Sequence, residues 1–125
     1  MKNDVDRWQP NMEETIKIEA QLKESVLGQI NNLISFKHLN HYLMNVTAIP
    51  NGRAAFIIYF ETDVEWEAFK GSGLEDKFKL ICKKAVHKIA VPLGASKKIE
   101  VFCGSNSSEN EEREIKRVGW QAYIR

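Results

Sequence analysis

The sequence has no long run of apolar residues and little cysteine. No stretch of its 125 residues approaches the roughly 18 consecutive apolar residues of a membrane-spanning helix. The opening MKNDVDRWQP is charged, so we expect no secretory signal there. Only Cys82 and Cys103 are present, far apart in the sequence, which is not the spacing of a disulfide framework or a metal-ligand pair. These absences predict a cytoplasmic protein without membrane contact.

A recognisable phosphate-binding motif is also missing. The stretch VFCGSNSSEN (101–110) has the Gly, Ser and Asn content of a phosphate loop. However, Ser108 and Glu111 have capping-box spacing, and three glutamates in the first turn of the following helix would repel a phosphate. We predict a polar turn followed by a capped structural helix. The stretch GSGLEDK (71–77) lacks both the GxGxxG and the Walker pattern and predicts a linker, so no cofactor is expected.

The sequence contains no coherent catalytic set, and only weak candidates stand out. His41 lies near a predicted junction between a helix and a strand, without further ligands at metal-binding spacing, so no metal site is expected. Cys103, next to Gly104, is the better candidate for a reactive thiol, and Asp63 begins a small acidic cluster after a strand. An enzyme would require these three dispersed residues to converge in the fold.

Composition and length are those of an ordinary globular protein. The chain is 43% hydrophobic and 28% charged, and 125 residues suffice for a core without disulfide support. We expect a flexible polar arm over residues 1–11 and a single α+β domain over residues 12–125.

Three helices are predicted from apolar spacing and capping signals. Residues 12–34 favour a helix with its apolar stripe at Ile16, Ala20, Leu27, Ile30 and Ile34. Alternation over residues 15–21 leaves a short strand open as the alternative. Thr62 and Glu65 predict the start of a short helix over residues 63–70. Residues 74–90 predict a longer helix, with a core stripe at Leu74, Phe78, Ile81, Ala85 and Ile89.

Strands are predicted over residues 42–49, 54–61, 97–103 and 119–125. The first two flank Asn51-Gly52, the strongest short-range hairpin signal. The fold class predicted is α+β, with an antiparallel sheet of about four strands around this hairpin and two main helices packed on it. If residues 15–21 are a strand, the order becomes that of a ferredoxin-like plait.

The predicted strand Ala54–Phe60 is apolar on both faces, which favours a protein partner or self-association. Such a protein would be regulatory, an inhibitor or an adaptor, and self-association would make it a homodimer. The candidate partner-binding residues are Phe56, Ile58, Phe60, Trp66 and Trp120.

Charge is unevenly distributed and suggests nucleic-acid binding as the alternative. Residues 1–76 hold 7 basic and 12 acidic residues, a net −5, and residues 77–125 hold 11 and 5, a net +6. The candidate basic patch consists of Lys77, Lys84, Lys88, Lys97, Lys98, Arg113, Lys116 and Arg117. The isoelectric point of about 7.8 is below the value above about 9 that is typical of dedicated nucleic-acid binders.

Overall fold

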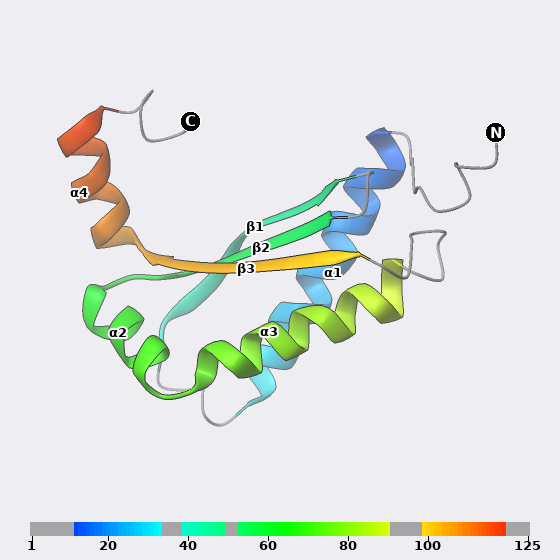
Figure 1. Ribbon diagram of the computed structural model, residues 1–125, viewed down its shortest axis with the longest axis horizontal. Helices are drawn as coiled ribbons and strands as arrows, with labels where there is room; N and C mark the ends of the chain where they lie inside the picture. The colour runs from blue at the N-terminus through cyan, green and yellow to red at the C-terminus, as the bar shows by residue number, and fades with distance from the viewer. Residues whose placement is uncertain (1–11, 34–38, 50–52, 91–98, 120–125) are drawn as a thin grey trace.

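The computed structural model describes residues 12–33, 39–49, 53–90 and 99–119. Helices alternate with the strands of one small sheet along the chain (Figure 1). The elements are α1 (Met12–Asn32), β1 (His41–Ile49), β2 (Arg53–Phe60), α2 (Asp63–Gly71), α3 (Leu74–Ala85), the π-helical turn η3 (Val86–Ala90), β3 (Glu100–Ser107) and α4 (Ser108–Val118). The α+β class predicted from the sequence is confirmed.

The described strands form a mixed three-stranded sheet in the order β1-β2-β3. β1 and β2 are antiparallel, with Tyr42 opposite Tyr59 and a shift of register between Leu43 and Asn45. β2 and β3 are parallel, with Phe56 opposite Cys103. We predicted an antiparallel sheet of about four strands, and the predicted antiparallel direction is wrong for β3, which runs parallel to β2. The physical reason is the connection: α2 and α3 form a crossover that returns the chain to the end of the sheet where β2 began.

α1 is a continuous helix through residues 15–21, so the ferredoxin-like alternative is wrong. Its buried residues are Ile18, Leu22, Val26 and Ile30. They repeat every four residues and form one stripe along the helix. Ile16, which we placed in the stripe, lies off it and is 60% exposed.

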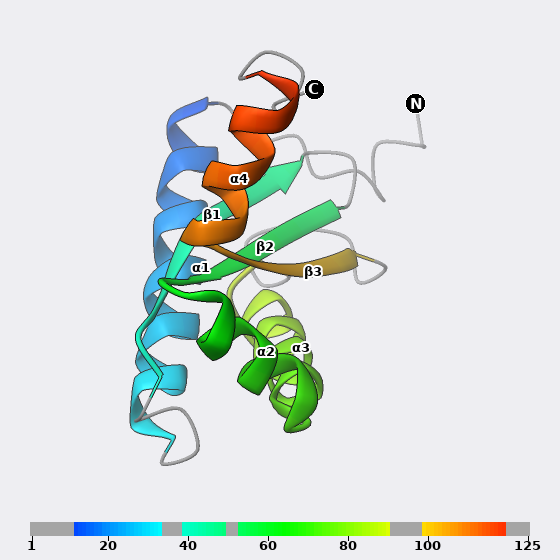
Figure 2. The same ribbon diagram turned by 90° about the vertical axis from the view of Figure 1, so that its left-hand side faces the viewer.

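α1 and α3 lie side by side on the same face of the sheet and bury it (Figures 1 and 2). Phe56, Ile58 and Phe60 of β2 point into this layer and are 0% exposed. The Phe60 ring contacts Phe69 of α2, with centroids 4.9 Å apart, and Phe69 contacts Phe78 of α3 at 6.1 Å. Burying each such side chain stabilises the fold by about 1.5–3 kcal/mol.

The start of α2 confirms the predicted capping box. The Thr62 hydroxyl accepts a hydrogen bond from the Glu65 amide, and the Glu65 carboxylate accepts one from the Thr62 amide. Glu65 also accepts a bond of 2.9 Å from the amide of Asn40, which ties the start of β1 to α2. Gly73 separates α2 from α3 in a left-handed conformation with φ of 80°, which a glycine adopts without strain.

β3 continues to Ser107, and α4 begins at the next residue. The polar turn predicted after Cys103, over GSNS (104–107), is therefore wrong, because pairing with β2 continues to Ser107 and holds that stretch extended. The helix cap is Ser107 rather than Ser108, and the Ser107 hydroxyl accepts a bond of 2.9 Å from the Asn110 amide. The predicted arm over residues 1–11 and residues 120–125 of the predicted last strand lie outside the described residues.

Candidate interaction surface

The face of the sheet opposite α1 and α3 carries apolar side chains that the described part of the chain does not fully cover. We call it the open face, and it comprises Tyr42, Ala55, Ile57, Tyr59 and Phe102. These residues alternate along their strands with the buried core residues. Phe102 is 62% exposed and Tyr42 is 40% exposed, Ala55 and Ile57 are half-buried, and Tyr59 is buried. The doubly apolar pattern of β2 thus reflects a core on one side and an open apolar surface on the other.

The open face is continuous from β1 to β3. The rings of Tyr42 and Tyr59 stack across the two antiparallel strands, with centroids 5.6 Å apart. On β3, Phe102 leans over Gly104, since a Cβ at position 104 would lie 3.4 Å from the Phe102 ring and 3.7 Å from Ile57. Phe102 and Ile57 therefore flank position 104 and continue the apolar surface from β2 to β3.

α4 rises from one end of the open face, on the side away from α1 and α3 (Figures 1 and 2). None of its residues is buried. The Tyr59 hydroxyl donates a hydrogen bond of 2.8 Å to the Glu111 carboxylate, so this side of the helix faces the sheet. Ile115 follows one turn later, and Val118, which is 37% exposed, about two turns later on the same side. Together with the open face, Ile115 and Val118 form what we call the interaction surface.

Polar bonds around Asp63 anchor the base of α4. The Asp63 carboxylate accepts hydrogen bonds from Arg113 and from the hydroxyl of Ser107, which is 0% exposed. The Asp63 amide donates a bond of 2.7 Å to Glu109. The hydrogen bond from Arg113, followed by that from Ser107, lowers the pKa of Asp63 below its ordinary value. Asp63, a candidate catalytic residue from the sequence, thus joins α2 to α4.

The other two catalytic candidates, His41 and Cys103, lie apart from one another along the sheet. The His41 ring contacts the Leu39 carbonyl at 2.9 Å and the Asn31 side chain at 3.2 Å. His41 pairs with Phe60 of β2, whereas Cys103 pairs with Phe56, four residues earlier and about 13 Å away along the strand. Within the described ranges, no three His, Cys, Asp or Glu residues are grouped to hold a metal ion.

Most of the predicted partner-binding residues are occupied within the chain. Phe56, Ile58 and Phe60 are core residues under α1 and α3, so the surface offered by β2 is its other face. Trp66 is half-buried; its indole N–H donates a bond of 2.9 Å to the Ser105 hydroxyl, and the Lys70 ammonium lies 3.8 Å from its ring centroid. Trp120 lies outside the described residues.

The predicted basic residues do not form one patch. Lys77, Lys84 and Lys88 are exposed on the helix that begins with α3, below the sheet in Figure 1, whereas α4 stands above it. On α4, Arg113 pairs with Asp63, and Arg117 pairs with Glu114 at 2.8 Å. Lys116 is exposed nearby, and Lys97 and Lys98 lie outside the described residues.

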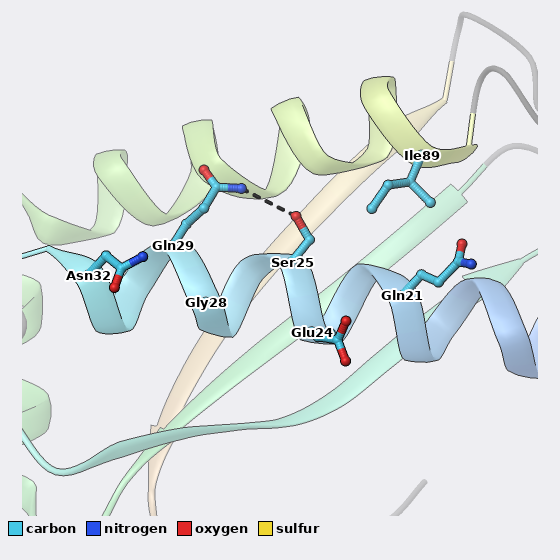
Figure 3. Close-up of a pocket in the computed structure, with 7 residues that line it drawn as sticks. All are labelled: Gln21, Glu24, Ser25, Gly28, Gln29, Asn32 and Ile89. Carbon is cyan, nitrogen blue, oxygen red and sulfur yellow. Dashed lines mark hydrogen bonds between the residues drawn. The ribbon is translucent and has the colours of Figure 1, made fainter.

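A shallow groove runs between α1 and the end of the α3 helix (Figure 3). Ser25 and Gln29 point across it, joined by a hydrogen bond of 3.3 Å, and Ile89 faces them from the other side. Glu24 is the single ionisable residue among those that line it.

One feature of the open face could be predicted from the sequence, and two could not. The alternation of Val101 and Cys103 on one face of the strand places Phe102 on the other, so its position was predictable. The exposure of Phe102 and the contribution of Tyr42 were not, since they depend on which face α1 and α3 cover.

No family model matches the chain, and neither a curated protein nor a solved structure shows significant similarity to it. None of the helices in the described ranges is long and apolar enough to cross a membrane.

Proposed function

We propose that this protein acts through protein–protein interaction, and that the interaction surface binds a second copy of the chain. The observation that carries the proposal is the 62% exposure of Phe102 within the open face. The role that follows is that of a small regulatory or adaptor protein without a cofactor, in a reducing compartment such as the cytoplasm.

Leaving the apolar side chains of the open face in water costs free energy. Removing apolar surface from water favours association, and contiguous exposed apolar patches mark interaction sites. Parallel strand pairs such as β2 and β3 are usually covered on both faces. Among the described elements α1 and α3 cover one face of the sheet, and the proposed partner would cover the other.

A second copy fits because the chain offers two elements that can cover each other. The α4 helix stands off the end of the sheet, so that the helix and the open face could both contact a partner (Figure 2). In a twofold arrangement, α4 of each subunit would lie against the open face of the other, with Ile115 and Val118 over Ile57 and Phe102. Stable dimers bury about 800 Å² on each partner, which requires both the sheet and the helix to take part.

Charge is compatible with this pairing. The chain has a net charge of +1, so two copies repel each other weakly. Arg53 and Glu100 pair at 3.4 Å at the end of the open face away from α4, and both are largely exposed. An antiparallel pairing of two subunits would bring Arg53 and Glu100 of one subunit close to Glu112 and Lys116 on α4 of the other. Each group carries one positive and one negative charge, so opposite charges could pair.

The test is sedimentation equilibrium of the full chain over a range from micromolar to several hundred micromolar. The disruptive variant is Phe102→Glu, and the matched control is Leu80→Glu, because Leu80 is 53% exposed on α3 below the sheet. Circular dichroism would establish that both variants fold.

We expect the wild type and Leu80→Glu to dimerise with similar dissociation constants, and Phe102→Glu to weaken association at least tenfold. A desolvated carboxylate in an apolar interface causes this loss. A wild type that stays monomeric at several hundred micromolar would refute self-association, as would a dimer that tolerates Phe102→Glu but not Leu80→Glu.

A second candidate function is nucleic-acid binding, favoured by the lysines of the α3 helix. Lys77, Lys79, Lys83, Lys84 and Lys88 are exposed, and none pairs with an acidic residue of the described ranges. We expect any such binding to weaken steeply with salt, because each neutralised phosphate releases a counterion. Titration of mixed-sequence DNA and RNA with Lys84→Glu/Lys88→Glu, against Lys17→Glu/Lys23→Glu on α1 as control, tests it. Binding that is insensitive to the α3 pair would exclude this surface.

A further inference from the structure

The fold brings the two cysteines together although 20 residues separate them in the sequence. Cys82 lies on the sheet-facing side of α3 and is 0% exposed. Cys103 lies on the core face of β3, opposite Phe56, and packs against the same core. The two thiols are within hydrogen-bonding reach of each other, and neither is in a disulfide.

Cys103, unlike Cys82, is reachable from solvent. It is half-buried and borders a small surface depression of about 10 Å³, which is the size of a single water molecule. Glu75, Lys79 and Ser105 supply the polar part of its lining. Cys103 therefore lies on the side from which a small polar oxidant would approach, whereas Cys82 is enclosed in the core.

The surroundings favour ionisation of Cys103 over Cys82. The hydrogen bond from the Cys82 thiol lowers the pKa of Cys103, and the ammonium groups of Lys79 and Lys83 lower it further, against the opposing effect of burial. The same hydrogen bond and burial raise the pKa of Cys82, which stays protonated. A half-buried thiol with a lowered pKa beside a buried thiol is the arrangement of a peroxide-sensitive pair.

We propose that Cys103 and Cys82 form a redox-active pair, in which a hydroperoxide oxidises Cys103 and Cys82 then closes an intramolecular disulfide between β3 and α3. In the first step, the Cys103 thiolate attacks a peroxide oxygen, the S–O bond forms and the O–O bond breaks. The sulfur loses two electrons to the peroxide, whose leaving oxygen takes a proton and departs as water or an alcohol. In the second step, the Cys82 sulfur attacks the sulfenic acid, and water leaves with the Cys82 proton.

The test treats the reduced full chain with hydrogen peroxide and follows thiol content, intact mass and the non-reduced digest. The wild type is expected to lose both thiols and two hydrogens in mass, and to yield a single linked peptide that contains Cys82 and Cys103. Cys82→Ser, with Cys82→Ala as a second variant of apolar character, is expected to accumulate a sulfenic acid at Cys103 that a dimedone probe captures. Cys103→Ser is expected to leave Cys82 unoxidised.

Substituting Lys79 and Lys83 tests the electrostatic effect on the oxidation rate, which a purely structural role of these lysines would not change. Lys79→Met/Lys83→Met is expected to slow the oxidation below the pKa of Cys103, by about threefold for each unit by which that pKa rises. The thiolate fraction falls tenfold per unit, while the intrinsic nucleophilicity of the sulfur rises about threefold. Lys77→Met/Lys84→Met, on the exposed side of the same helix, is the control and is expected to leave the rate unchanged.

Three results would overturn the proposal. Both thiols of the folded wild type could survive a peroxide dose that fully oxidises free cysteine. The disulfide could form only between Cys103 residues of different chains, visible as a covalent dimer on a non-reducing gel. The two lysine pairs could change the rate equally, which would remove the local effect of Lys79 and Lys83.

Discussion

Neighbouring isoleucines on β2 allow the two faces of the sheet to be compared directly. Ile58 points into the core and is 0% exposed, whereas Ile57 is half-buried on the open face. Ile58→Ala removes atoms that α1 and α3 cover and leaves a cavity, which costs about 3 kcal/mol of unfolding free energy. Ile57 borders solvent on the open face, so Ile57→Ala leaves no closed cavity and costs about 1 kcal/mol.

The assay is urea unfolding followed by circular dichroism. With a slope of about 1.5 kcal/mol per molar urea, Ile58→Ala is expected to lower the midpoint by about 2 M, and Ile57→Ala by about 0.6 M. The measurement belongs at low micromolar protein, since a dimer through the open face would stabilise the wild type more at higher concentration. Equal losses at low concentration, or a larger loss for Ile57→Ala, would refute the assignment of the two faces.

Two further predictions concern the polar contacts of α2 and α4. Arg113 and Ser107 lower the pKa of Asp63 in the folded state. The ionised Asp63 therefore stabilises the fold fully above its unfolded-state pKa of about 3.9, and this stabilisation is lost as the pH falls through its folded-state pKa. The stability difference between the wild type and Asp63→Asn in urea unfolding is therefore expected to shrink between about pH 6 and pH 2, and a constant difference would contradict this linkage. Thr62→Ala is expected to lower the unfolding free energy by about 1 kcal/mol through loss of the capping bond, and Thr62→Ser to retain most of it; equal losses for both would show that the hydroxyl cap contributes nothing.

Local signals in the sequence predicted the helices well. The helix positions follow from residues that are neighbours in the chain, and they could therefore be predicted. These signals are the Thr62 and Glu65 capping box, the glycines around residue 72 and the apolar stripe of α3. The exact stripe of α1 was harder to predict. Ile16 and Ile18 are alike in hydrophobicity, and only the docking of the helix on the sheet decides that Ile18 is buried.

The direction of β3 and the use of each strand face depend on contacts between distant residues. Pairing with β2 keeps GSNS extended, although its composition is typical of a turn. Phe56 and Phe102 are both aromatic strand residues, yet one is core and the other is 62% exposed. The proximity of Cys82 and Cys103 likewise arises from the packing of α3 on β3, which no sequence spacing reports.

The most direct test of the interaction surface is a dilution series of ¹H–¹⁵N correlation spectra of the wild-type chain, from several hundred micromolar downward. Self-association through the open face and α4 predicts that concentration-dependent shifts gather at Tyr42, Ile57, Phe102 and Ile115. The exposed residues of α3, such as Leu80 and Lys84, should not shift. Shifts confined to α3, or spectra that do not change with concentration, would contradict the proposal.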